Sequence, residues 1–166
     1  CKGGRQVSTR SYIARQVGPD QYRTIFCHFD GYLEHVGAML AGHYDTEEMV
    51  DKLLNVGDVD ALYPQLYPDP DQPHDHWNKQ QDVTVAYGRD YGEMESEATI
   101  KTMDELEQES GYIEFTYIFA EDKRWKFFHA GQSCEGLKDL KDTLDQMGID
   151  YLPKEQTEEV AFEQTM

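Results

Sequence analysis

The sequence has 166 residues, of which 39% are hydrophobic, and its 33 acidic and 15 basic side chains give a formal net charge of −18. The apolar content excludes a disordered chain, while the charge disfavours direct binding to DNA or RNA, because that affinity comes largely from basic side chains at phosphates. No apolar run approaches the roughly 18 residues that cross a bilayer, so we expect a cytoplasmic protein without membrane contact.

The N-terminus has two interpretations. The chain begins with Cys1 rather than methionine, and the Lys-Gly-Gly that follows is what a purine-rich bacterial ribosome-binding site encodes when it is translated in frame. Val7 then corresponds to a GTG start codon, and residues 1–10 hold a mis-assigned start. The alternative is a native disordered tail. Three cysteines without paired spacing predict no disulfide framework.

The first segments of the chain predict a hairpin and a helix. The runs at 11–17 and 22–29 are rich in aromatic and β-branched residues, and they flank a Gly-Pro-Asp turn. Residues 32–44 repeat apolar side chains at spacings of three and four, which indicates one buried helical face.

A second helix, a loop and a strand follow. Asp45, with a glutamate three residues later, predicts a capping box for a helix over 46–57, which ends in a glycine. Residues 63–82 contain four of the six prolines and predict an unusually long loop. The segment 83–93 reads as a third strand that ends in a glycine-marked turn.

The second half of the chain predicts a short helix and a second hairpin. Thr102 and Glu105 have the spacing of a capping box for an acidic helix that Gly111 ends. The runs at 112–119 and 124–130 form the clearest hairpin, because apolar residues alternate along the first of them.

The last predicted element is a helix over 136–148, before an acidic, flexible tail at 153–166. Its inward residues are expected to be Leu137, Leu140, Leu144 and Met147. Hairpins mixed with helices, without regular strand-helix-strand alternation, indicate an α+β fold. We expect one domain over 11–152, with an antiparallel sheet of two hairpins plus one further strand, and about four helices mainly on one face.

The stretch "IFCHFDGYLEHVG" holds the residue types of a Cys-His-Asp catalytic arrangement. Strand alternation, however, places Cys27 and His28 on opposite faces, so we expect Cys27 in the core. His28 and Asp30 form a candidate acid-base pair, with His35 nearby. Asp30 is better explained as a turn residue that caps the helix starting near Tyr32.

"HDH", at His74 and His76, resembles part of a metal site. No Cys-x-x-Cys or His-Glu-x-x-His pattern supports it, so we expect exposed loop histidines and no metal or other cofactor. Arg89 is a lone cation beside an acidic run. It is expected to pair with Asp90 or Asp30, or to contact an anionic ligand, and internal pairing is favoured in so acidic a chain.

Acidic residues are dense within twenty positions of the sequence: Asp90, Glu93, Glu95, Glu97, Asp104, Glu105, Glu107 and Glu109. An extended face of carboxylates resembles the phosphate array of duplex DNA and is steered towards basic surfaces. The alternative is a solvated acidic surface that keeps the protein soluble.

The segments "SYIA", "YRTIFCHFDGY", "VGAMLAGHY", "GDVDAL" and "AYGRDYGE" resemble small acidic proteins of bacteriophages, prophages and related mobile elements. The resemblance runs from about Ser11 to Phe128 and implies a genetic context, but no catalytic residue. In size and charge the chain is also similar to DNA-mimic antirestriction proteins, although their sequence motifs are absent.

These observations predict a non-enzymatic accessory protein of a phage or mobile element. It is expected to bind a host or defence protein with a basic surface, with an acidic, DNA-like face over residues 90–109 and the tail as the contact. The first alternative is a small enzyme or metal-binding protein that uses His28, Asp30 and His35. The second is a structural protein without a ligand site.

Overall fold

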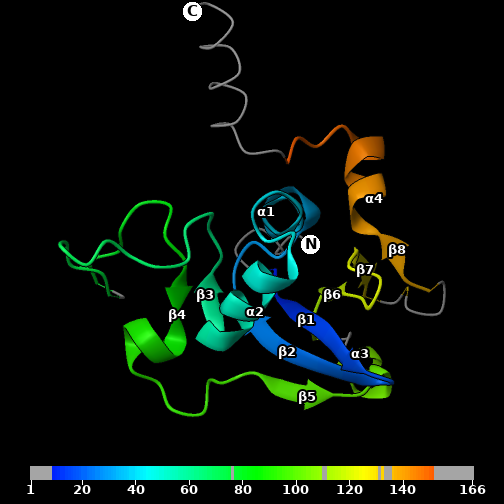
Figure 1. Ribbon diagram of the computed structural model, residues 1–166, viewed down its shortest axis with the longest axis horizontal. Helices are drawn as coiled ribbons and strands as arrows, with labels where there is room; N and C mark the ends of the chain where they lie inside the picture. The colour runs from blue at the N-terminus through cyan, green and yellow to red at the C-terminus, as the bar shows by residue number, and fades with distance from the viewer. Residues whose placement is uncertain (1–8, 76, 110–111, 131, 133–135, 152–166) are drawn as a thin grey trace, which may run out of the picture.

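The computed structural model describes residues 9–75, 77–109, 112–130, 132 and 136–151. The predicted α+β fold is confirmed: an eight-stranded sheet carries helices on its two faces (Figure 1). The strand order is β4-β3-β2-β1-β6-β7-β8, and β5 pairs with β2 as well. The predictions for the N-terminal start, for Gly111 and for the acidic tail fall outside the described residues.

Both predicted hairpins are present. The first consists of β1 (Ser11–Gly18) and β2 (Gln21–Cys27), and the second of β6 (Phe115–Phe119) and β7 (Trp125–His129), each paired antiparallel. The two hairpins join through β1 and β6, which run parallel. The sheet is therefore mostly antiparallel, and its parallel pairs are β1 with β6 and β2 with β3.

The remaining strands are short. They are β3 (Val59–Ala61), β4 (Val85–Ala86), β5 (Thr99–Lys101) and β8 (Lys138–Asp139). The strand predicted over 83–93 is thus only two residues long, because at Tyr87 the chain turns into a π-helix, η3 (Tyr87–Tyr91). Strands of two or three residues leave no periodic signal in a sequence, which is why β3, β5 and β8 were not predicted.

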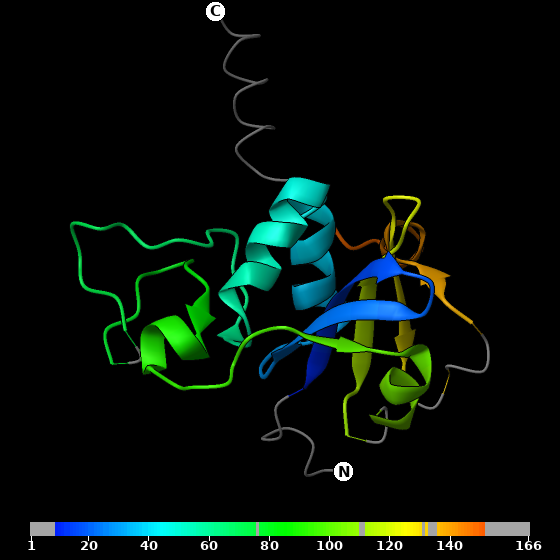
Figure 2. The same cartoon turned by 60° about the horizontal axis from the view of Figure 1, so that its bottom comes forward.

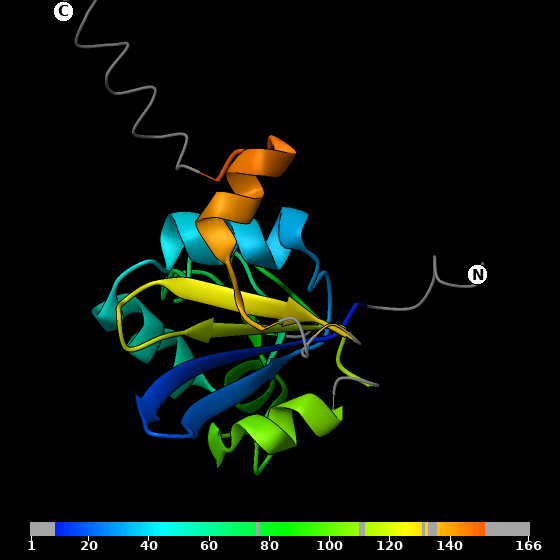
Figure 3. The ribbon, with the colours of Figure 1, turned by 90° about the vertical axis from the view of Figure 1, so that its right-hand side faces the viewer.

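Among the described residues, three α-helices cover one face of the sheet and one covers the other (Figure 3). On the first face lie α1 (Ala38–His43), which follows the π-helical turn η2 (Leu33–Gly37), α2 (Glu47–Val56) and α4 (Leu140–Met147). The helix α3 (Met103–Gln108) packs on the opposite face. The expectation of helices mainly on one face agrees with this arrangement.

The helix caps correct two details of the sequence analysis. The N-cap of α2 is Thr46, whose hydroxyl accepts a hydrogen bond from the Met49 amide, while Asp45 pairs with Lys141. The predicted capping box of Thr102 and Glu105 is present at α3. α4 begins only at Leu140, so Leu137 precedes the helix and is exposed rather than inward. Met147, the last residue of the helix, is exposed as well.

The main core lies between the sheet and the three helices on its first face. It contains Ile13 and Ile25 of the first hairpin, Tyr117 of the second, and apolar side chains of α1, α2 and α4. A smaller core under α3 includes Leu106 and Phe128. The alternating strand residues therefore supply apolar side chains to two cores, as period-two patterning requires.

The joint between β2 and η2 is tightly packed at Gly31. Its amide donates to the Thr9 carbonyl at 2.9 Å, and its carbonyl accepts from the buried Tyr117 hydroxyl at 2.7 Å. A Cβ at Gly31 would lie 2.8 Å from both the Ser11 Cβ and the Thr9 carbonyl oxygen. Asp30, directly before it, adopts a left-handed conformation with φ of 58°. The Asp-Gly pair is therefore a close-approach turn.

We expect Gly31→Ala to lower the free energy of unfolding by about 1 to 3 kcal/mol, because the added methyl group would overlap with Thr9 and Ser11 at the start of β1. Gly37→Ala is the matched control, since a Cβ there would make ordinary contacts at 3.4 to 3.5 Å. Urea denaturation of both variants measures the difference. Equal stability of Gly31→Ala and the wild type would contradict this packing.

Candidate functional site

A buried carboxylate gathers three side chains at one end of the sheet. Asp60, on β3, is 5% exposed, and its Oδ1 and Oδ2 accept hydrogen bonds from the hydroxyls of Tyr87 at 2.9 Å and Tyr91 at 3.0 Å. His28, directly after β2, places Nδ1 3.3 Å from Asp60 Oδ1 and 3.0 Å from the Tyr87 hydroxyl. We call these four residues the His28 cluster.

The hydrogen bonds of the cluster define which ring nitrogen of His28 carries the proton when the ring is neutral. Tyr87 has one hydroxyl proton, which it donates to Asp60, so its oxygen accepts from Nδ1–H of His28. The neutral ring then has a lone pair on Nε2, and within the described chain Nε2 makes no hydrogen bond. The side chain as a whole is 31% exposed, so the ring carries an unused proton acceptor on a partly exposed residue.

The two tyrosines remain protonated donors at neutral pH. Burial, followed by the hydrogen bond to Asp60, raises the pKa of Tyr87 well above its ordinary value and the pKa of Tyr91 to about 12. The ammonium group of Lys79 lies 4.0 Å from Asp60 Oδ2 and adds a compensating charge. Asp60 is thus a buried anion that is neutralised by donors from three segments.

The other residues predicted near His28 do not join this cluster. Cys27 is fully buried, and burial raises the pKa of its thiol to about 12, so it is a core residue as predicted. The Nε2–H of His35 donates to the Leu62 carbonyl at 2.8 Å. These contacts make Cys27 and His35 structural residues.

Asp30 does not cap the following helix, so that prediction is wrong. Its carboxylate accepts from the Tyr32 hydroxyl at 3.1 Å, and η2 has no side-chain cap. The left-handed backbone of Asp30 instead directs its carbonyl to the Val36 amide at 3.2 Å. The proposed combination of Asp30 and His35 with His28 is therefore not assembled.

Arg89 forms the internal pair that the sequence favoured. Its guanidinium contacts both oxygens of Asp90, with Nε 2.9 Å from Oδ1 and Nη2 3.0 Å from Oδ2. The same group donates to the carbonyls of Leu66 at 2.8 Å and Thr84 at 2.6 Å. Arg89 therefore connects the proline-rich loop to the segment before η3, and all of these partners are internal.

His74 is buried rather than exposed, contrary to expectation. Its side chain is 2% accessible; Nδ1 accepts from the Gln80 amide at 3.0 Å, so Nε2–H donates to Asp90 Oδ2 at 3.1 Å. Both ring nitrogens are engaged, which removes His74 as a metal ligand. His76 falls outside the described residues. In the described ranges, no three His, Cys, Asp or Glu side chains gather as a metal site requires.

We call His74, Arg89 and Asp90 the loop anchor. Burial alone would raise the pKa of Asp90, but hydrogen bonds from Arg89 and from the Ala86 amide outweigh it and hold the pKa below its ordinary value. Asp90 is 6% exposed. It therefore lies beneath the surface and is not part of an acidic face.

The other predicted carboxylates divide into two groups. Glu107 and Glu109 are half-buried, and Glu109 accepts from Tyr12 and Lys101. The exposed ones, which we call the acidic surface, are Glu93, Glu95, Glu97, Asp104 and Glu105. None of these five forms an ion pair with a described residue.

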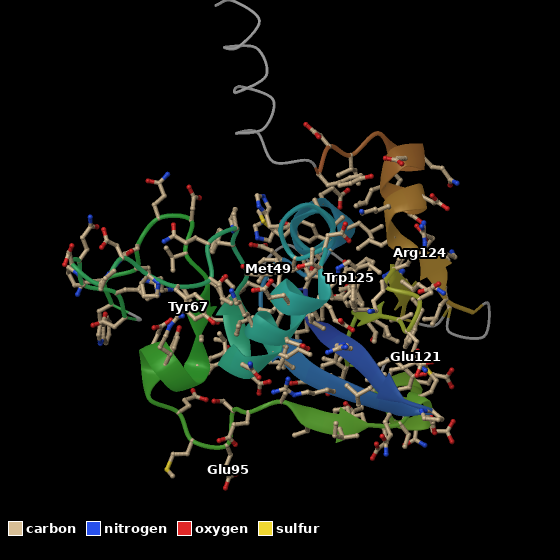
Figure 4. All side chains as sticks on the ribbon, in the orientation of Figure 1. Met49, Tyr67, Glu95, Glu121, Arg124 and Trp125 are labelled. Carbon is tan, nitrogen blue, oxygen red and sulfur yellow. The ribbon has the colours of Figure 1, made fainter. Side chains whose placement is uncertain are left out.

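Basic side chains are concentrated elsewhere. Around the turn between β6 and β7, Lys123 pairs with Glu47 at 3.0 Å and Arg124 with Asp139 at 2.6 Å. Figure 4 shows Arg124 on the right of the molecule and Glu95 at its lower margin. Glu95 therefore lies away from this paired region. The cations nearest to the acidic surface are Lys101 of β5 and Arg23 of β2, and neither forms an ion pair with its five carboxylates in the described part of the chain.

Comparisons with protein-family models, with curated proteins and with solved structures found no match. The resemblance to phage proteins therefore stays a prediction. Three of the segments that carry it, "YRTIFCHFDGY", "GDVDAL" and "AYGRDYGE", supply the four residues of the His28 cluster. No helix in the described ranges has the length and apolar character of a membrane span.

The sequence analysis missed Asp60, Tyr87 and Tyr91 as partners of His28. One signal was available: Asp60 is a charged residue inside the apolar run "VDAL". Charged side chains in such a position are buried only when they are paired. The identity of the partners was not accessible, because Asp60 and His28 lie 32 residues apart.

At pH 8, neutral His28 should carry its proton on a different ring nitrogen from His35 and His74. We expect His28 to carry its proton on Nδ1, and His35 and His74 on Nε2, because each ring faces a defined acceptor. Long-range proton–nitrogen NMR spectra distinguish the two forms. Asp60→Asn should shift only the His28 signals and lower the free energy of unfolding by about 2 kcal/mol. A His28 ring protonated on Nε2 would contradict the cluster.

Asp90→Asn should reduce the free energy of unfolding by about 2 to 4 kcal/mol near neutral pH, because it leaves Arg89 without a counter-ion. The folded pKa of Asp90 is below its ordinary value of 3.8, so its contribution is complete above that pH and is lost as pH falls further. Denaturation between pH 7 and 3 should show the wild-type advantage shrinking only at the acidic end. An advantage that is unchanged at pH 3 would contradict this assignment.

Proposed function

We propose that the protein acts by binding a partner protein that has a basic surface, and that the acidic surface is the contact region. The observation that carries this proposal is the set of five exposed carboxylates without an ion-pair partner among the described residues. Exposed like charges repel one another, and a basic partner removes that repulsion. The net charge of −18 also accelerates encounter with such a partner.

The class of partner follows from charge and from the phage-type resemblance. A surface of carboxylates competes with DNA phosphates for Lys and Arg side chains, so a DNA-binding enzyme of the host or of its defence fits best. On this proposal the protein is an accessory inhibitor encoded by a phage or mobile element. Its binding should weaken strongly with salt, since the Debye length falls from about 10 Å at 0.1 M to about 3 Å at 1 M.

A second candidate function rests on His28. A histidine whose Nδ1–H donates to a tyrosine hydroxyl, which is itself bonded to a buried carboxylate, and whose ring is partly exposed has the arrangement of a general base. This favours a small enzyme as the runner-up, with Asp60 in the place that the sequence assigned to Asp30. It ranks second because Cys27, the nearest nucleophile type, is buried with a raised pKa.

Removing three charges tests the leading proposal. Immobilised E93Q/E95Q/E97Q should capture much less of a basic protein from bacterial lysate at 0.1 M salt than the wild type does. The control E34Q/D71N/E121Q removes the same charge from exposed carboxylates elsewhere and should capture normally. Wild-type capture should disappear towards 1 M salt.

Three results would contradict the proposal. Equal losses in the two triple variants would assign the effect to net charge alone. Capture that survives high salt would rule out a charge-directed contact. A biological effect that is lost in His28→Gln while capture of the basic protein is unchanged would favour the enzyme.

A further inference from the structure

One margin of the sheet is open at β5. The strand pairs with β2 through Thr99, Ile100 and Lys101, and no other described strand pairs with it. β5 runs along the lower margin in Figure 1 and comes forward in Figure 2. Because backbone amides and carbonyls alternate in direction along a strand, part of β5 directs its hydrogen-bonding groups away from β2.

The lysine on this edge does not protect it against pairing. Lys101, the side chain that would commonly guard it, turns inward, with Nζ 3.4 Å from Glu109 and 5.4 Å from the centre of the Tyr12 ring. Ile100 lies opposite Arg23 of β2 and is 55% exposed. An exposed apolar residue on an unpaired edge favours the addition of another strand.

The edge is also held at both ends. The Ser96 carbonyl accepts from the Asp58 amide at 2.7 Å, which fixes the entry to β5. The Thr102 amide donates to Glu105 at 2.8 Å within the capping box, which fixes its exit. A partner strand therefore meets a pre-formed segment, and little ordering entropy is lost on binding.

We propose that β5 is a pairing edge to which a basic, extended segment of a partner protein adds as a further strand. This inference rests on the proposed function and specifies how the acidic surface is used. Three carboxylates precede β5 and two follow it, so Lys and Arg side chains of an added strand find counter-ions at both ends. Main-chain hydrogen bonds supply affinity, and an apolar residue beside Ile100 supplies register.

Charge identifies the occupant among the alternatives. A second copy of this chain would bring its own acidic surface against the first, with a net charge of −18 on each copy. Nucleic acid would be repelled for the same reason. A basic peptide segment meets complementary charge and complementary backbone groups at once.

The test uses two synthetic heptapeptides of equal charge. One alternates Lys and Val, and the other has proline in place of the central Val, so that it keeps the charge but cannot pair as a strand. By NMR titration at low salt, the first peptide should bind about tenfold more tightly, since strand addition contributes main-chain hydrogen bonds. It should also slow amide exchange within residues 99–101.

Two exposed positions supply matched variants. Ile100→Lys should weaken binding of the Lys-Val peptide, while Val17→Lys adds the same charge at an exposed site on the β1–β2 hairpin and should weaken it much less. Amide spectra of each variant confirm the fold. If the two peptides bind equally and exchange at 99–101 is unchanged, or if neither peptide binds, the strand-addition inference is overturned. The proposed function fails separately, if E93Q/E95Q/E97Q captures as much from lysate as the wild type.

Discussion

The salt bridge between Arg89 and Asp90 is the interaction on which the arrangement beside the sheet depends. The Arg89 guanidinium donates to the backbone carbonyls of Leu66 and Thr84. The Asp90 carboxylate accepts hydrogen bonds from the buried His74 ring and from the Ala86 amide. A long polar loop has few apolar contacts to hold it, so a partly buried ion pair with several further hydrogen bonds takes that role. Both residues of the pair belong to η3, whose Tyr87 donates to Asp60.

That internal pairing has an electrostatic consequence for the surface. Arg89 lies beside the acidic run and pairs with a carboxylate that is itself buried, while Lys101, inside the run, pairs with the half-buried Glu109. The five carboxylates of the acidic surface then face solvent without a local counter-ion. The open edge of β5 lies between these carboxylates in sequence. The two proposals therefore place the contact with a partner on the same margin of the molecule, which comes forward in Figure 2.

Local patterns predicted the parts of the fold that depend on neighbours in sequence. The two hairpins followed from alternation and turn residues, and the capping box at Thr102 followed from a spacing of three. The parallel pairing of β1 with β6 joins distant segments, and no local signal encodes it. The candidate site shows the same difference. The pairing of Arg89 with its sequence neighbour Asp90 was predictable, whereas the contact of His28 with Asp60 joins residues 32 positions apart. The burial of His74 was not predictable, because its contacts with Asp90 and Gln80 form only in the folded loop.

Amide hydrogen exchange at Gln80 and Ala86 tests most directly whether the Arg89–Asp90 pair organises this region. The Gln80 amide donates to His74 at 3.0 Å and the Ala86 amide to Asp90 at 2.8 Å, so both report on the anchor. We predict that both are protected in the wild type and that Arg89→Gln accelerates both. The Ala130 amide, which donates to Glu114 in the distant second hairpin, should be unaffected. An unprotected Gln80 amide in the wild type would show that the anchor does not order the loop. Unchanged exchange in Arg89→Gln would show that the loop is ordered without this salt bridge.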